Sequence, residues 1–541
     1  MKKYFPFLII ISFIFNSCYT QNSDVKNNKE YKSLEEALEN PEDVYHLSLE
    51  EDSLKSLSPE ISKLVNLEVL ELEDNQLKEL PKEVWELKNL KRLDLDQNYF
   101  TEIPSGIGKL ENLEELDLDN NRLKALPAAI GKLKKLKKLD LDNNEITKLP
   151  SGIGKCTSLE IIEISNNKLT GLPAEIGQLK NLKVLVASIN KMSTLPAQIA
   201  NLENLSNLSL DSNQFINLPE EIGKLKNLKN LYLQKNNIVS LPKSIGELDS
   251  LQILMVNNNK LKSLPENFGK LSNLFALYIS NNELTALPEN FGNLSQITEL
   301  NLTNNKLESL PASIGNMTNL TTLLLDTNQL KSLPPEIGKL ENLIILSAWK
   351  NQLKTLPEEI GNLTNLSQLI LEQNELTSLP AGIGKLEFLS VLEVDSNNLT
   401  KIPVELFNCL NLTKLDFEKN HISYLPPEVG KLKSLTYLDF EKNNLTRLPV
   451  EIDSLSSLEF FSLGGNQLTT LPDSMQHMFN LQNLGLEDNP ITKMPESILD
   501  CPRITEMNLT GTKLSPMERR LLEFWVTNHA FTGGDWNDYG D

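Results

Sequence analysis

Cysteine and histidine are scarce in this sequence, with four residues of each among 541. The four histidines lie far apart along the chain and do not have the ligand spacing of a zinc site. No serine, threonine or cysteine is paired with a base in a pattern that predicts nucleophilic catalysis. The sequence therefore argues against a metal site and an enzyme, and we expect no cofactor.

A long apolar segment is also missing. The longest run, from Phe7 to Phe15, is too short to cross a bilayer, which takes about 20 residues. Lys2 and Lys3 precede this run, and the layout is that of a secretory signal peptide. Without a longer run, the sequence predicts no transmembrane helix.

The end of the apolar run carries a short motif. Phe15-Asn16-Ser17-Cys18 resembles a bacterial lipobox, in which the cysteine is acylated and becomes the mature N-terminus. The resemblance implies a signal peptide at residues 1–17, a lipid on Cys18 and a polar tether at residues 18–30. The protein is then expected in the bacterial cell envelope, as an outer-membrane or cell-surface lipoprotein held to the membrane by its lipid alone. An ordinary secreted protein is the alternative.

The sequence is rich in one repeat of 23 residues, LxLxxNxLxxLPxxIGxLxxL. Its asparagine recurs without insertion or deletion from Asn75 to Asn489, and Asp52 and Thr512 hold the same phase at the two ends. This makes 21 repeats over about residues 44–514. The pattern resembles the leucine-rich repeat family, in the form seen in Ras-pathway scaffolds, plant Ras-group proteins and bacterial surface proteins.

The chemistry of the repeat agrees with that resemblance. Alternating leucines bury one face of a short strand, so that each repeat adds one strand to a parallel sheet. The asparagine amide can turn inward and bond buried backbone groups. Because no repeat buries its leucines alone, stacking is obligatory. We therefore expect an α/β solenoid, a leucine-rich repeat horseshoe of about 21 repeats with a parallel β-sheet on its concave face and helical turns on its convex side.

The two ends of a solenoid expose its core, and both ends of this repeat carry helix signals. Ser33 begins a capping box, which predicts a helical cap at residues 31–43. Ser515 begins a second one at the start of residues 515–541, which we expect to form a helical cap and a flexible acidic tail. The helical period predicts that one face covers the last repeat; this face is Met517, Leu521, Leu522 and Trp525.

Three of the four cysteines, Cys156, Cys409 and Cys501, replace the same leucine of the repeat. Cys409 and Cys501 are four repeats apart, or roughly 19 Å by strand stacking, and Cys156 is further away. A disulfide tolerates only about 7 Å between Cα atoms. We therefore expect these three to be buried apolar residues rather than paired cysteines.

Two variable positions in LxLxxN, those after the first and after the second leucine, point to the concave face; we name them the first and second slots. Two zones of these slots are acidic. The first zone is Glu71, Glu73, Asp94, Asp96, Asp117, Asp119, Asp140 and Asp142. The second is Glu393, Asp395, Asp416, Glu418, Asp439 and Glu441.

These acidic zones have a plain interpretation and two functional ones. With a net charge of −21, they can be a solvated surface that keeps the protein soluble. They can also attract a basic protein partner or bind divalent cations. Nucleic acid is disfavoured as a partner, because its phosphates would be repelled from this face.

Between the acidic zones the slots are largely uncharged, and several are apolar. Five such residues share the first slot and Trp349 occupies a second slot; the set is Tyr232, Met255, Tyr278, Leu324, Ile370 and Trp349. Ile253 and Ile345, each just before the first leucine of its strand, can widen this patch. Exposed aromatic residues beside methionine and isoleucine are typical of binding hot spots, whereas neutral drift would leave them without a ligand.

Together these features predict a non-enzymatic scaffold or receptor of the bacterial cell envelope. It binds a protein partner on its concave face, and the acidic zones favour a basic one. The alternatives are a glycan-binding protein and a structural adhesin or spacer with no discrete ligand.

Overall fold

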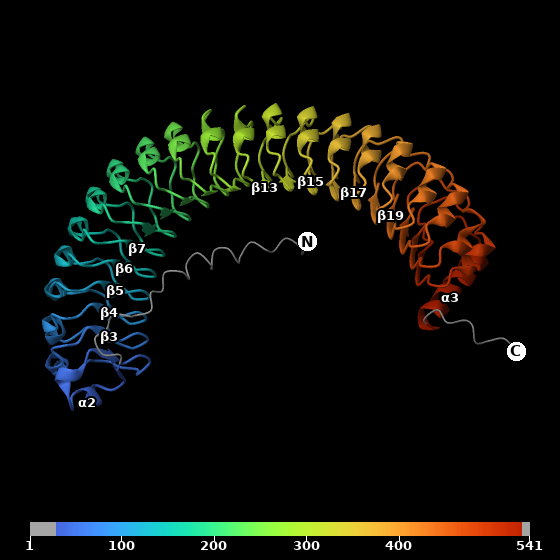
Figure 1. Cartoon of the computed structure of the whole chain (residues 1–541). Helices are drawn as coiled ribbons and strands as arrows, with labels where there is room; N and C mark the ends of the chain where they lie inside the picture. Colours follow the sequence, from blue (N-terminus) through green and yellow to red (C-terminus); the bar gives the residue numbers. More distant parts are fainter. Residues whose placement is uncertain (1–28, 533–541) are drawn as a thin grey trace. The chain divides into compact units, whose positions relative to one another are not determined.

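The computed structural model describes residues 29–532, which leaves the expected signal peptide, Cys18 and the tail after residue 532 outside the described part. The chain divides into two compact units, Met1–Leu205 (unit 1) and Ser206–Asp541 (unit 2). Both units are built from the predicted repeat, with strands along the inner side of each and short helical turns along the outer side (Figure 1).

Unit 1 has eight parallel strands. Neighbours pair in the order of the chain from β1 to β8, and in the repeats each strand leucine lies opposite the corresponding leucine or isoleucine of the next. The strands are β1 Glu30–Tyr31, β2 His46–Ser48, β3 Val69–Glu71, β4 Arg92–Asp94, β5 Glu115–Asp117, β6 Lys138–Asp140, β7 Ile161–Glu163 and β8 Val184–Val186.

Unit 2 has fourteen strands, which also pair in parallel and in chain order. The strands are β9 Asn207–Ser209, β10 Asn230–Tyr232, β11 Ile253–Met255, β12 Ala276–Tyr278, β13 Glu299–Asn301, β14 Thr322–Leu324, β15 Ile345–Ser347, β16 Gln368–Ile370, β17 Val391–Glu393, β18 Lys414–Asp416, β19 Tyr437–Asp439, β20 Phe460–Ser462, β21 Asn483–Gly485 and β22 Glu506–Asn508.

The helical turn predicted on the convex side is a 3-10 helix. In unit 1 these turns are η1 Pro41–Asp43, η2 Pro59–Lys63, η3 Lys82–Glu86, η4 Ser105–Lys109, η5 Ala128–Lys132, η6 Ser151–Lys155, η7 Ala174–Gln178 and η8 Ala197–Asn201. In unit 2 they are η9 Glu220–Lys224, η10 Lys243–Glu247, η11 Phe268–Lys270, η12 Phe291–Asn293, η13 Ala312–Asn316, η14 Pro335–Lys339, η15 Glu358–Asn362, η16 Ala381–Lys385, η17 Val404–Asn408, η18 Pro427–Lys431, η19 Val450–Ser454, η20 Met475–His477 and η21 Glu496–Asp500.

The asparagine of the repeat acts as predicted. All nineteen, from Asn75 to Asn489, are buried. In Asn259 the amide Nδ2 donates to the carbonyls of Leu233 (2.9 Å) and Val256 (3.1 Å), and Oδ1 accepts from the backbone N–H of Ile238 (2.9 Å). One side chain thus joins neighbouring turns through backbone groups that have left the strand ladder.

The residue before most of these asparagines has a left-handed backbone, which the sequence did not reveal. Asn258, for example, has φ +57°, and Ile189 has φ +51°. Asparagine tolerates this conformation, but a β-branched residue is strained in it. Ile189 is therefore a site of local strain in unit 1, with 53% of its surface exposed.

The N-terminal cap was predicted to be helical, but it combines a short strand, a short helix and a 3-10 turn. Helix α2, Leu34–Ala37, begins at Ser33, whose Oγ accepts a hydrogen bond from the N–H of Glu36. It covers only part of the helical cap predicted at residues 31–43. Ahead of it β1 pairs with β2, so that Glu30, assigned to the tether by sequence, lies in the sheet.

The C-terminal helix α3, Pro516–Thr532, also begins as predicted, with Ser515 Oγ accepting from the N–H of Glu518. Its predicted buried face is right only in part, and Trp525 is half-buried. Leu522 is buried, but Met517 and Leu521 are 74% and 63% exposed. Two polar contacts join the start of the helix to the last repeats: Arg519 donates to the carbonyl of Thr512 (3.0 Å), and Glu518 accepts from the N–H of Met494 (3.1 Å).

Candidate functional site

The first slots of unit 2 form one continuous column on the outward face of the sheet. In β12, Leu277 points into the core and is 2% exposed, whereas Tyr278 points outward and is half-buried. Strand pairing places equivalent residues side by side. The column runs Tyr232, Met255, Tyr278, Asn301, Leu324, Ser347 and Ile370.

Five of the six residues predicted as a patch therefore share this column, which we name the apolar column. It spans roughly 29 Å from Tyr232 to Ile370 at about 4.8 Å per strand. Asn301 and Ser347 interrupt it. Burial raises the pKa of Tyr232 and Tyr278, so both phenols stay neutral at physiological pH. The column offers apolar area together with neutral hydroxyl groups.

Trp349 lies beside this column, in the second slot that follows β15. Its backbone N–H donates to Asp326 Oδ1 (3.2 Å), and Ser347 donates its hydroxyl to the same oxygen. Burial raises the pKa of Asp326, although these hydrogen bonds act in the opposite direction. The Lys350 ammonium lies 5.9 Å from the centre of the indole ring. Trp349 is thus half-buried and held by its neighbours.

The suggested widening of the patch receives uneven support. Ile345 is half-buried in β15, next to the apolar column. Ile253 is only 7% exposed in β11 and offers little surface to a ligand.

The first acidic zone lies in unit 1, where its first-slot members stand opposite one another in register, Glu71, Asp94, Asp117 and Asp140. The few cations near them come from the residue just before the first strand leucine, two places before the first slot. Arg92 contacts Glu71 (3.5 Å) and Asp94 (3.0 Å), and Lys138 contacts Asp140 (3.5 Å). Within residues 29–532, Asp117 makes no ion pair.

These carboxylates have shifted pKa values. Burial, and then repulsion from neighbouring carboxylates, raises the pKa of Asp117 and Asp140. The same causes raise the pKa of Glu73 to about 7. Burial raises the pKa of Asp142 to about 6. Glu71 differs, because a hydrogen bond with His46 and the charge of Arg92 outweigh burial and lower its pKa.

The first-slot aspartates also have a local structural role that sequence reasoning missed. In Asp94, Asp117 and Asp140, Oδ1 accepts a hydrogen bond from the backbone N–H two residues further on, at 3.1–3.2 Å. Asp416 and Asp439 in unit 2 do the same. This contact satisfies a backbone donor at the end of each strand, so part of the preference for aspartate is structural.

The second acidic zone continues the apolar column directly, since Ile370 pairs with Glu393 and the register then runs through Asp416 to Asp439. Lysines partly neutralise this zone. Lys414 pairs with Glu393, Lys419 with Glu418 (2.8 Å), and Lys442 with Glu418 and Glu441. Burial raises the pKa of Asp416 to about 7, and nearby carboxylates add to it.

The structure gives no support to cation binding or to thiol chemistry. In the described residues, no group of three histidine, cysteine or acidic side chains is arranged to hold a metal ion. Cys156, Cys409 and Cys501 are fully buried and unpaired, as predicted. Burial raises their thiol pKa to about 11–12, and each Sγ–H donates to a backbone carbonyl at 3.2 Å.

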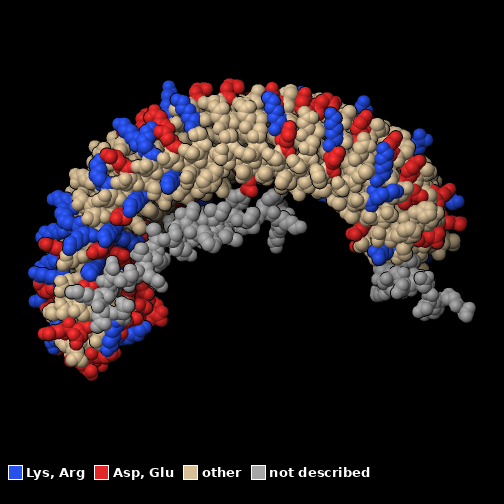
Figure 2. Space-filling model, in the orientation of Figure 1, with Lys and Arg blue, Asp and Glu red and all other residues tan. Residues whose placement is uncertain are grey.

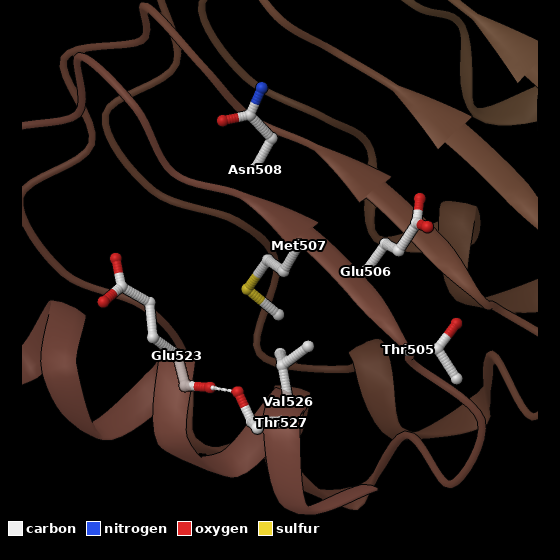
Figure 3. A pocket seen from close by; sticks show the side chains of 7 residues that line it. All are labelled: Thr505, Glu506, Met507, Asn508, Glu523, Val526 and Thr527. Atoms are coloured by element: carbon white, nitrogen blue, oxygen red, sulfur yellow. Dashed lines mark hydrogen bonds between the residues drawn. The ribbon is translucent and has the colours of Figure 1, made fainter. Parts of the chain in front are cut away.

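A cavity of about 390 Å³ lies between β22 and α3 (Figure 3). Met507, Glu506 and Glu523 line it, and Thr527 donates its hydroxyl to the backbone carbonyl of Glu523 (2.8 Å). The cavity marks where the capping helix meets the last strand. Most of its lining is polar, but Glu506, Asn508 and Glu523 point away from one another instead of converging on a ligand (Figure 3).

The fold and these outward columns define a repeat solenoid with one exposed sheet face. The family described as "Leucine-rich repeat region" matches the chain at residues 26–121, 90–167 and 219–309. A second family, described as "Leucine rich repeat", matches residues 157–215, 388–445 and 411–468. The chain belongs to the leucine-rich repeat family, whose members are generally binding scaffolds rather than enzymes.

Solved structures agree with this assignment. A leucine-rich repeat protein of Leptospira interrogans is 33% identical, over 92% of this chain and 98% of that one, with a TM-score of 0.39. The ectodomain of the Arabidopsis thaliana receptor kinase GASSHO1/SCHENGEN3 is 30% identical, over 88% and 68% of the two chains, with a TM-score of 0.52.

A third structure is the Arabidopsis receptor kinase HAESA in complex with the peptide hormone IDA and the co-receptor SERK1. It is 26% identical to this chain, over 87% and 84% of the two chains, with a TM-score of 0.62. A search of curated proteins found no match to the chain.

Proposed function

We propose that this protein is a non-enzymatic receptor or scaffold of the bacterial cell envelope. It binds a protein or peptide partner on the sheet face of unit 2, through the apolar column and Trp349. The partner carries apolar anchors beside basic residues, because the column runs directly into the second acidic zone.

The single observation that carries the proposal is the uninterrupted start of the apolar column. Tyr232, Met255 and Tyr278 stand side by side in register, and each is half-buried although none is needed for the leucine core. Aromatic and methionine side chains of this kind are enriched in binding hot spots. HAESA, which binds a peptide hormone, supports a partner of the same chemical kind.

The place of the protein in the cell rests on its N-terminal segment. Cys18 follows an apolar run in a lipobox-like motif, so lipid on this cysteine is the proposed anchor. The part of the chain that the structure describes contains no helix with the length and apolarity of a membrane span. A secreted protein without lipid is the alternative.

Photocrosslinking tests the proposed binding face. A benzophenone amino acid replaces Trp349 in one variant and Phe479, which is 53% exposed in unit 2, in another. In the producing cells, the first variant is expected to form one defined crosslinked product that is absent from the second. Equal or diffuse crosslinking at both positions contradicts a site at Trp349 and favours a spacer without a discrete ligand.

A further inference from the structure

One side of each unit is formed by the residues two places before the first strand leucine, which we name the flank column. In unit 1 it alternates in charge over six repeats, and successive residues form ion pairs: Lys91–Glu68 (2.8 Å), Lys137–Glu114 (2.6 Å) and Lys183–Glu160 (2.7 Å). In unit 2 nine consecutive members are uncharged. They are Gln252, Phe275, Thr298, Thr321, Ile344, Ser367, Ser390, Thr413 and Thr436.

Figure 2 agrees with this contrast. On the face that it draws, charged side chains crowd the repeats around β3 to β6, whereas much of the inner part of the repeats around β13 to β17 is free of them. The uncharged flank column of unit 2 thus differs from the charged one of unit 1.

A groove of about 700 Å³ follows the flank column from Thr298 to Ser367. A row of asparagines, Asn319, Asn342 and Asn365, forms its other wall, and Phe388 stands at one end. Ile344 and Phe388 are 45% and 58% exposed, so the groove has apolar surface among its polar groups. No lysine, arginine, aspartate or glutamate lines it.

The asparagines of this groove present acceptor oxygens. Each of the three asparagines uses its Nδ2 to donate to a backbone carbonyl of the preceding repeat, at 2.8–2.9 Å. Their Oδ1 atoms accept no hydrogen bond from any residue in the described chain. The hydroxyl of Thr321 likewise donates to the carbonyl of Thr298 (3.0 Å). The groove thus presents acceptors at the strand spacing of about 4.8 Å.

These features select one kind of ligand. A charged ligand would find no charged side chain of opposite sign among the residues that line the groove. An extended peptide brings as many acceptors as donors, and its side chains recur on one face about every 6.6 Å, out of step with the groove. A second copy of the chain would need to bury about 800 Å² on each partner, more than a groove of four repeats offers.

We propose that this groove binds a neutral oligosaccharide, at a site separate from the apolar column. Every sugar ring carries hydroxyl groups that rotate to donate to the Oδ1 atoms of the asparagine row. The apolar face of a ring packs against Ile344 or Phe388. The chain of rings lies along the repeats, so that successive rings meet successive asparagines.

The test uses the purified full chain and three neutral probes, cellohexaose, maltohexaose and chitohexaose. Saturation-transfer NMR and titration measure binding, with a hexamer of galacturonate and an uncharged, end-blocked hexapeptide as comparison probes. At least one neutral hexasaccharide is expected to bind, and the galacturonate hexamer and the peptide are not.

The blocking variant is Thr321→Glu with Ile344→Lys, which places in the groove the Glu–Lys pair that unit 1 carries at the same positions. Because the repeat already accommodates this pair, the thermal midpoint should stay unchanged while hexasaccharide affinity falls about tenfold or more. Trp349→Ala should leave that affinity intact. The proposal is overturned if none of the three hexasaccharides binds, if only the peptide binds, or if the blocking variant binds as well as the unaltered chain.

Discussion

Removing two neighbouring asparagines of the ladder should cost more than the sum of the single removals. Asn259→Ala leaves the buried N–H of Ile238 without its only acceptor, and Asn282→Ala does the same to the N–H of Leu261. One unsatisfied buried donor costs about 1–3 kcal/mol, so each single variant should lose about that much stability.

The excess in the double variant comes from one carbonyl. Val256 O accepts from Nδ2 of Asn259 (3.1 Å) and from Nδ2 of Asn282 (3.0 Å). Either single variant leaves it one partner, whereas the double variant leaves it none within the described chain. We therefore expect about 1–3 kcal/mol beyond additivity.

Urea unfolding followed by circular dichroism measures the free energies of unfolding. Hydrogen exchange of peptides containing Ile238 and Val256 locates the opening, because a solenoid can open locally. Leu261→Ala, a core cavity expected to cost about 2–5 kcal/mol, and Lys262→Ala, an exposed change expected to be near neutral, set the scale. A double variant that matches the sum of its singles within about 0.5 kcal/mol refutes the shared-carbonyl account.

Three further predictions concern pH, strain and the anchor. Glu73, Asp142 and Asp416 have pKa values of about 6–7 in the folded chain, so the folded chain binds more protons than the unfolded one. The thermal midpoint should therefore fall as pH rises from about 5 to 8, and Asp142→Asn should reduce this slope. A flat or rising midpoint contradicts the raised pKa values. Ile189→Asn should relieve a left-handed strain and stabilise unit 1 by about 1 kcal/mol in urea unfolding, and a destabilised variant would show that Ile189 makes a contact that offsets the strain. Cys18→Ala should release the protein from the membrane fraction or leave its precursor unprocessed, and normal processing with membrane retention would rule out the lipid anchor.

The period of the repeat predicted most of the fold. Because the side-chain period of a strand is two, the phase of the leucines determined which residues are buried, and all 21 repeats supplied a strand, β2 to β22. The phase of Asn259 likewise predicted an inward amide, which four hydrogen bonds now describe. The same period also predicted which first-slot residues lie side by side in the apolar column.

What the sequence did not predict depends on contacts outside the repeat. Strand β1 has two residues and no pattern, and only its pairing with β2 defines it. Arg519 and Glu518 of α3 make hydrogen bonds to other turns of the chain, and a helical period cannot predict these contacts. The groove beside the flank column was not predicted, because none of its residues belongs to a sequence motif and only the strand register brings them together.

The most direct test of the binding face uses peptides selected from a random library against the purified full chain. Their affinity is measured for the unaltered chain, for Trp349→Ala and for Phe479→Ala, with the thermal midpoint of each protein measured alongside. If the apolar column and Trp349 form the site, Trp349→Ala should weaken binding by 2 kcal/mol or more, or about thirtyfold, with little change in midpoint, and Phe479→Ala should do neither. Selected peptides that bind all three proteins equally, or a Trp349→Ala chain that unfolds while its folded fraction binds normally, would contradict the account.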